Sequence, residues 1–314
     1  MDSARAAIQV RGLRKSYGGE PAVRGIDLCI EEGEVFALLG PNGAGKTTTI
    51  EILEGFRRRD GGEVTVLGID PDHQPRSLKR RIGIVLQSTG VDRYLTVAET
   101  IAMYSSYYPH PRPTDEILDL VGLDEKRNVR VLKLSGGQQR RLDVAIALAG
   151  DPELLFLDEP TTGFDPSARR EAWEIVKNLR SLGKTVLLTT HYMDEAQNLA
   201  DRVAVIAKGT IVAEGPPDTI AGRDHLQVIV RFSAPDDVLV PGHLGVRVDS
   251  GGVCEFTPGD LTRDLLALTS WAVEGGFQLA NLQILRPTLE DVYLELTHSV
   301  DSPAPSPAPE LVHE

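Results

Sequence analysis

Residues 40–48 read Gly40-Pro41-Asn42-Gly43-Ala44-Gly45-Lys46-Thr47-Thr48, and this stretch decides the fold. It matches the phosphate-binding pattern G-x-x-x-x-G-K-[ST] at every fixed position. An apolar run at 35–39 predicts a buried strand before it, and residues 47–53 have the composition of a helix. We therefore expect a nucleotide-binding loop in an α/β fold, whose glycines turn backbone N–H groups towards a phosphate. Lys46 would reach the β- and γ-phosphates, and the Thr47 hydroxyl would hold Mg²⁺.

A second cluster follows another apolar run, because residues 154–159 read Leu-Leu-Phe-Leu-Asp-Glu. An open α/β sheet presents its functional groups at the carboxyl ends of its strands. Asp158 is therefore predicted to hold Mg²⁺ directly or through water, and Glu159 to polarise an attacking water molecule. The alternative for each cluster is an ordinary turn, glycine-rich or acidic, without a ligand. The two clusters together disfavour that alternative.

A third glycine-rich turn lies at 134–138, where Leu134 is followed by Ser135-Gly136-Gly137-Gln138. Ser135 is a plausible N-cap, and the apolar residues after it recur at helical spacing. The N-terminus of such a helix is a second possible anion site. Physical reasoning alone does not separate this function from that of an ordinary capped helix.

The order of these motifs resembles the nucleotide-binding subunit of an ATP-binding cassette (ABC) transporter, and the resemblance covers residues 8–220. It implies a P-loop NTPase of the ABC type that uses ATP and Mg²⁺. The resemblance also implies that the turn at 135–138 is the family signature. That turn would contact the γ-phosphate of ATP bound to an opposite subunit, so that two chains sandwich two nucleotides.

Four single residues extend the resemblance. Tyr17 matches the aromatic residue that stacks on adenine, and Gln87 matches the glutamine that touches Mg²⁺ and senses the membrane partner. Asp165 matches an intersubunit signalling loop, in which Phe164 stands where the family usually has leucine. His191 matches the switch histidine on the γ-phosphate. Each alone has an ordinary alternative, such as a packing tyrosine or a loop cap, but their order and spacing together favour the functional interpretation.

Composition limits the function classes. The chain has 314 residues, of which 41% are hydrophobic and 25% are charged, as in a globular protein with a large core. The net charge of −13 argues against a nucleic-acid surface and against a polybasic membrane footing. No apolar run is long enough to span a bilayer, and the first residues lack the apolar run of a secretory signal. Cys29 and Cys254 are far apart, which fits a reducing compartment and offers no metal cluster.

The chain is expected to have three parts. Residues 1–220 would form the nucleotide-binding domain, with a helical subdomain at about 92–150 that docks on the membrane subunit in the resembled family. Gly215-Pro216-Pro217 marks the boundary. Residues 221–298 would form a small C-terminal α+β domain, and the Pro-rich tail at 299–314 is expected to be disordered.

Local patterns predict the elements within these parts. Strands are expected at 9–13, 25–30, 203–206, 210–215, 225–232, 246–256 with a turn at 250–252, and 277–285. Helices are expected at 97–104, 115–121, 261–272 and 289–296. The last helix belongs to residues 287–297, which resemble the C-terminal element of daunorubicin-resistance-type drug-efflux ABC ATPases. Its amphipathic spacing is equally compatible with plain core packing.

The resulting interpretation is a Mg²⁺-dependent ATPase that drives a separate transmembrane permease. The resemblance implies a homodimer in the ATP-bound state, peripheral to the cytoplasmic face of the membrane, and export of drugs, lipids or other hydrophobic compounds. One alternative is an importer ATPase, which shares the cassette. Another is a non-transport ABC ATPase. Too few residues separate Lys46 from Ser135 for the long coiled coil of DNA-repair members, and this chain has one cassette, whereas ribosome-associated members have two.

Overall fold

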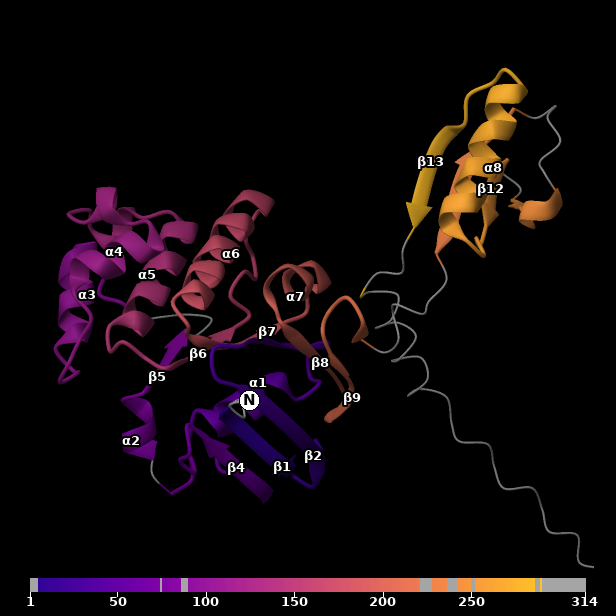
Figure 1. Ribbon diagram of the computed structural model, residues 1–314. Coiled ribbons are helices and arrows are strands. Elements are labelled where there is room, and N and C mark those ends of the chain that lie inside the picture. Colours follow the sequence, from indigo (N-terminus) through magenta and orange to yellow (C-terminus); the bar gives the residue numbers. More distant parts are fainter. Residues whose placement is uncertain are drawn as a thin grey trace, which may run out of the picture. The chain divides into compact units, whose positions relative to one another are not determined.

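The computed structural model describes residues 5–73, 75–85, 90–220, 228–235, 242–249, 252–285 and 289. The chain divides into two compact units, Met1–Ile220 and Ala221–Glu314. Both units mix helices with sheets (Figure 1). Within the described residues, no helix has both the length and the apolar character needed to cross a membrane.

The first unit is built on a six-stranded sheet in the order β5-β6-β7-β3-β8-β9, in which only β9 runs antiparallel. The strands are β3 (Val35–Leu39), β5 (Ile82–Val85), β6 (Leu154–Asp158), β7 (Thr185–Thr190), β8 (Arg202–Ala207) and β9 (Thr210–Gly215). The central strands are buried along almost their whole length, which explains the apolar runs of β3 and β6 and the Val-Leu-Leu centre of β7. Since β3, β6 and β7 are parallel, the segments after them meet at one edge of the sheet.

A second, antiparallel sheet has the order β2-β1-β4. It comprises β1 (Ala6–Tyr17), β2 (Glu20–Glu31) and β4 (Gly61–Val66). Helix α1 (Lys46–Leu53) contacts β2 and β4 of this sheet and β6 of the other. One continuous core therefore joins both sheets and includes Ile26, Phe36, Ile50 and Phe156. The helix that follows the phosphate loop is thus fixed on two sides.

Helices α3 and α4 confirm the predictions at 97–104 and 115–121, and α5 begins directly after the predicted cap at Ser135, whereas no ranges are predicted for α2, α6 and α7 (Figure 1). Helices α3, α4 and α5 contact one another. The helices are α2 (Pro75–Lys79), α3 (Val97–Ser105), α4 (Thr114–Val121), α5 (Gly136–Leu148), α6 (Pro166–Ser181) and α7 (Met193–Leu199), with short 3₁₀ turns at Asp124–Lys126 and Val131–Lys133. The predicted hairpin at its C-terminal end is confirmed, and its turn residues Lys208 and Gly209 both have positive φ, as a type I′ turn requires.

The second unit is a four-stranded antiparallel sheet in the order β11-β12-β10-β13. Its elements are β10 (Ile229–Ser233), β11 (Arg247–Val248), β12 (Val253–Phe256), α8 (Leu261–Glu274) and β13 (Ala280–Leu285), with a 3₁₀ turn at Gly242–Leu244. Phe232, Phe256, Leu268 and Trp271 form its small core. Leu289 is helical and 1% exposed. The rest of the helix predicted at 289–296 and the tail at 299–314 lie outside the described residues.

One buried acid lies at the end of α1. Glu54 is 2% exposed and caps the helix. Burial raises the pKa of its carboxyl to about 8, and the nearby carboxylates of Asp158 and Glu51 act in the same direction. The folded chain therefore holds a proton here at neutral pH, which the unfolded chain releases.

Glu54→Gln should become more stable than the wild type as the pH rises. The folded-state pKa lies above the ordinary value, so the contribution of Glu54 is fully present below about pH 4.5 and is lost as the pH rises to about 8. Urea denaturation at pH 6 and pH 9 should show the difference in unfolding free energy growing by about 2 kcal/mol in favour of the variant. Glu63→Gln, on the exposed side of β4, is the control and should show a constant difference.

Candidate functional site

The phosphate loop borders a cavity of about 580 Å³ at the carboxyl edge of the six-stranded sheet. The cavity is lined by Ala22, Pro41, Asn42, Gly43, Gly45, Lys46, Thr47, Thr48, Glu159 and Thr162. Its walls come from β2, the loop after β3, the first turn of α1 and the loop after β6. The structure therefore brings together the first two clusters that the sequence predicted.

The glycines of the loop are required for different reasons. A Cβ on Gly45 would lie 2.6 Å from the carbonyl oxygen of Ala22, and the residue has φ +105°. A Cβ on Gly40 would collide with the carbonyl of Ile206. Gly43 has open space around it but φ +80°, so conformation alone favours glycine there. The loop is therefore pressed against β2 and the end of β8, and its backbone can approach a phosphate closely.

Lys46 joins the loop to the second cluster. Its side chain is 4% exposed, and Nζ donates hydrogen bonds to the carbonyl oxygens of Gly40 at 2.8 Å and Pro41 at 3.2 Å. The same Nζ lies 3.5 Å from Oε1 of Glu159. A buried ammonium group needs such partners, because an isolated charge is costly to remove from water. The cation is thus held in the cavity between the loop and Glu159.

Glu159 has the left-handed φ of +46°, which is strained for a residue with a side chain. Its N–H donates to Oγ1 of Thr189 at 2.9 Å, and its Oε2 accepts from the Thr162 hydroxyl at 3.1 Å. Burial raises the pKa of its carboxyl, but the Thr162 hydrogen bond and the charges of Lys46 and His191 outweigh it. The pKa therefore lies below its ordinary value, and the carboxylate is ionised at neutral pH.

Asp158 is oriented by the neighbouring strand. The Thr189 hydroxyl donates to Oδ1 of Asp158 at 2.5 Å while accepting the Glu159 N–H. One hydroxyl therefore positions both acidic residues. Thr189 and Thr162 are absent from the sequence-based site, although two threonines at the end of the otherwise apolar strand 185–190 are a signal for the former.

The residues present fit a Mg²⁺–nucleotide complex. Thr47 lies in the cavity with Lys46, and Asp158 carries its carboxylate at the end of β6. Across the described part of the chain, no group of three or more His, Cys, Asp or Glu side chains is arranged to hold a metal by itself. Phosphate oxygens of a nucleotide would complete the ligands of a metal held by Thr47 and Asp158, which suits Mg²⁺.

The turn at 135–138 caps helix α5. The Ser135 hydroxyl accepts from the Gln138 N–H at 3.3 Å, and the Gln138 side chain accepts from the Ser135 N–H at 3.1 Å. This is a capping box. The turn also borders a cavity of about 620 Å³, together with Thr162 and Asp165. Lys46 and Glu159 do not line this cavity in the described structure, so the two glycine-rich turns of one chain face different cavities.

The other predicted site residues are placed as follows. His191 follows β7, and its Nδ1 lies 3.3 Å from Oε1 of Glu159 without hydrogen-bond geometry to any described residue. Asp165 caps α6, because its Oδ1 accepts hydrogen bonds from the N–H groups of Ser167 at 2.8 Å and Ala168 at 3.0 Å. Tyr17 is the last residue of β1 and is 42% exposed. It is not one of the described residues that line the phosphate-loop cavity. Gln87 lies outside the described residues.

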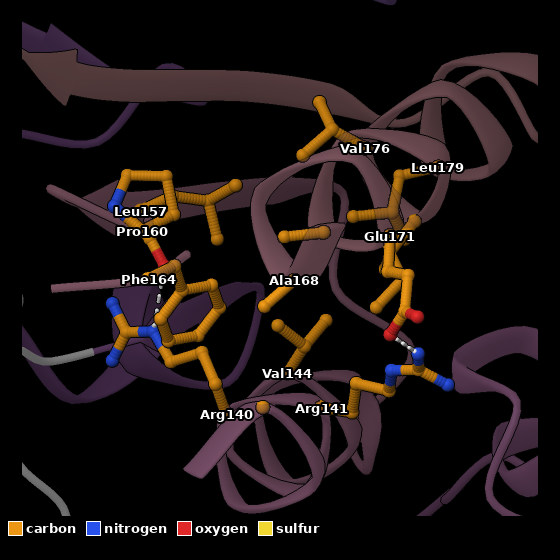
Figure 2. Close-up of a pocket in the computed structure, with 13 residues that line it drawn as sticks. Arg140, Arg141, Val144, Leu157, Pro160, Phe164, Ala168, Glu171, Val176 and Leu179 are labelled. Atoms are coloured by element: carbon orange, nitrogen blue, oxygen red, sulfur yellow. Dashed lines mark hydrogen bonds and ion pairs between the residues drawn. The ribbon is translucent and has the colours of Figure 1, made fainter. Parts of the chain in front are cut away.

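Helices α5 and α6 enclose a small apolar pocket next to the turn at 135–138 (Figure 2). Its apolar wall consists of Val144, Leu157, Pro160, Phe164, Ala168, Ala172, Ile175, Val176 and Leu179. Arg141 and Glu171 form an ion pair at its edge, and Arg140 points towards Pro160. Because Pro160 and Phe164 line this pocket together with residues of α5, helix α5, which begins at the turn 135–138, packs directly on the segment that follows Glu159.

Comparison with known proteins gives consistent matches. Residues 23–162 match the ABC transporter family. The chain is 39% identical over 306 residues to the daunorubicin resistance ATP-binding protein DrrA2 of Streptomyces coeruleorubidus, covering 93% of this chain and 95% of that protein. It is 40% identical over 306 residues to the Nod factor export ATP-binding protein I of Sinorhizobium fredii, covering 93% of this chain and 86% of that protein.

The solved structures that match this chain include two ABC transporter cassettes. The structure of cbiO1 from Clostridium perfringens, part of the ABC transporter complex cbiONQ, has a TM-score of 0.63 and 28% identity over 68% of this chain and 89% of that chain. The dimeric structure of MJ0796, a bacterial ABC transporter cassette, has a TM-score of 0.59 and 28% identity over 67% of this chain and 98% of that chain.

The two loop glycines with positive φ should respond differently to alanine. Gly43→Ala should lower the free energy of unfolding by about 1–2 kcal/mol, the cost of a left-handed conformation. Gly45→Ala carries the same cost and also collides with Ala22, so it should lose about 1–3 kcal/mol more. Urea denaturation of the two purified variants measures the difference, and equal losses would contradict the packing described for Gly45.

Proposed function

Because this chain belongs to the ABC transporter family, we propose that it is the Mg²⁺-dependent, ATP-hydrolysing subunit of a membrane exporter. The observation that carries the proposal is that Lys46 and Glu159 line the phosphate-loop cavity together, with His191 beside the Glu159 carboxylate. A phosphate-binding cation, an ionised carboxylate and a neighbouring histidine are the groups that phosphoryl transfer to water needs.

The phosphates of ATP would lie along the loop at 40–48, with the Lys46 ammonium on the β- and γ-phosphates. Thr47 and Asp158 would hold Mg²⁺, which neutralises charge on the phosphate oxygens. Gln87 is expected to complete that site, and Tyr17 to stack on adenine. The exposed ring of Tyr17 and the Arg57 guanidinium 5.1 Å from its centroid offer a flat, cationic surface for a base.

Glu159 would act as the general base. Its carboxylate is ionised at neutral pH, which is the form that can accept a proton from the attacking water. The Thr162 hydroxyl and the Thr189–Glu159 backbone contact orient it. His191, beside the same carboxylate, would contact the γ-phosphate.

Hydrolysis would take place in a head-to-tail homodimer. Two observations support this arrangement. The signature turn of residues 135–138 faces a cavity other than the one that contains Lys46, so within one chain it does not line the nucleotide site. MJ0796, which this chain resembles, was solved as a dimer. In the proposed dimer the turn completes the partner's nucleotide site, and Asp165 lies in the intersubunit loop.

The driven process is proposed to be export through a separate permease, from the cytoplasmic face of the membrane. Relatives that match nearly the whole chain are named for daunorubicin resistance and for Nod factor export. The helical subdomain at about 92–150 and the segment at Gln87 would contact the permease. The compounds would be drugs, lipids or other hydrophobic molecules. Co-purification of the full chain from membranes with a transmembrane subunit would test this assignment, and a substrate-binding protein in that complex would favour the importer alternative.

Glu159→Gln should retain ATP binding, lower the rate of hydrolysis by about 100-fold or more and accumulate an ATP-bound dimer. The amide cannot accept the proton of the attacking water, whereas the phosphate contacts remain. Hydrolysis is measured by phosphate release and the dimer by gel filtration with ATP. The matched control, Lys46→Ala in the same background, removes the phosphate-binding cation and should abolish the dimer. Hydrolysis at the wild-type rate would exclude Glu159 as the base.

Ser135→Arg tests the role of the signature turn. The bulky cation should leave ATP binding near normal, abolish hydrolysis and prevent the dimer when combined with Glu159→Gln. If Ser135 only caps α5, the variant should instead lose about 1 kcal/mol of stability and keep its activity. Nucleotide titration, phosphate release and thermal unfolding of the same preparation separate these outcomes.

A further inference from the structure

A buried arginine ties the signature helix to the backbone on both sides of Glu159. Arg140 lies on α5, five residues after Ser135, and is 9% exposed. Its Nε donates to the carbonyl oxygen of Pro160 at 3.2 Å, and its Nη2 donates to the carbonyl oxygen of Asp158 at 3.2 Å. Figure 2 shows this side chain reaching from α5 to Pro160. One guanidinium therefore holds the carbonyl oxygens of the residues directly before and directly after Glu159.

The chemistry of the guanidinium makes this link specific. Burial lowers the pKa of Arg140, against the opposing effect of the Asp143 and Asp158 carboxylates. Nη1 lies 3.7 Å from Oδ2 of Asp143, which belongs to the same helix. A buried cation is costly unless its donors find acceptors, and the rigid planar fork of arginine can reach two carbonyls at once. The Arg140 side chain therefore links helix α5 to the loop that contains Glu159.

Glu159 needs such support because of its backbone. A residue with φ +46° persists only when the surrounding structure holds it there. Thr189 holds its N–H, and Arg140 holds the carbonyls before and after it. A shift of α5 relative to β6 would therefore turn the Glu159 carboxylate within the cavity.

We propose that Arg140 is a positioning residue that sets the orientation of Glu159 according to the position of the signature helix. The proposal rests on the proposed function, in which residues 135–138 contact the partner's nucleotide and Glu159 is the base. Its consequence is that nucleotide contact at the signature turn of one chain aligns the base of that same chain. Hydrolysis at one site of the dimer is thereby made to depend on occupancy of the other.

The test compares Arg140→Met with Arg81→Met in the full-length chain. Arg81 is a matched control, because it also donates to a main-chain carbonyl, that of Leu67, and pairs with Glu153 at the opposite end of β6. Arg140→Met should lower kcat by about 10- to 100-fold, as misplacement of a reacting group does. The dissociation constant for ATP should change by less than about 3-fold, because the phosphate loop is untouched. Arg81→Met should leave both values within about 2-fold.

A double-mutant cycle with Glu159→Gln shows whether Arg140 acts through Glu159. In single-turnover assays, Arg140→Met should add no further loss to the residual hydrolysis of Glu159→Gln, and the ATP-bound dimer should still form. A merely structural role predicts that the two losses multiply. Arg140→Lys keeps the charge but reaches fewer acceptors, so its kcat should lie between those of the wild type and Arg140→Met. It should likewise add no further loss to Glu159→Gln. If Arg140→Met does not fold, the result for Arg140→Lys supports or overturns the proposal.

The outcomes separate this proposal from the proposed function. A kcat for Arg140→Met within about 2-fold of that for Arg81→Met, or multiplying losses in the cycle, overturns the role of Arg140 while Glu159→Gln still traps the dimer. Wild-type hydrolysis by Glu159→Gln itself overturns the assignment of the base, and the inference about Arg140 with it.

Discussion

The site depends on the need to compensate one buried positive charge, the ammonium group of Lys46. Removed from water, it requires acceptors, and the chain supplies two loop carbonyls and the Glu159 carboxylate. The loop can wrap the cation only because glycines let it pass close to β2 and the end of β8. Glu159 can approach it only because β6 is separated from β3 by β7 alone, and these parallel strands end at the same edge of the sheet. The sheet order, the glycines and the carboxylate are thus parts of one electrostatic arrangement.

Much of this fold was predictable from local pattern. Strands β3 and β6 are buried and nearly uniformly apolar, and the buried strand β7 has a Val-Leu-Leu centre flanked by threonines, so their sequences identify them without knowledge of their neighbours. The start of α5 was predictable for a similar reason, since the cap at Ser135 is formed by residues three apart. In the second unit the predicted bounds of the strands differ more from the observed bounds. Short strands such as Arg247–Val248 have too few residues to show an alternating pattern.

The supporting contacts of the site were not predictable in this way. Thr189, Thr162 and Arg140 act through partners that are distant in sequence or fixed by a turn, and no periodic pattern marks them. Arg140 is followed by Arg141 near the start of a helix, where charged residues are usually solvated, so burial of the first is a property of the packed fold alone. The motifs therefore identify the groups that are proposed to react, whereas tertiary structure identifies the residues that orient them.

The backbone of Glu159 has an evolutionary consequence. A left-handed φ is most easily adopted by glycine, and asparagine tolerates it better than glutamate does. Glycine and asparagine both lack the carboxylate, and aspartate, which also tolerates this φ, carries it on a side chain one methylene shorter. At this position, substitutions that raise thermal stability would lower turnover. Selection for heat resistance alone would therefore favour a stable protein that hydrolyses ATP poorly.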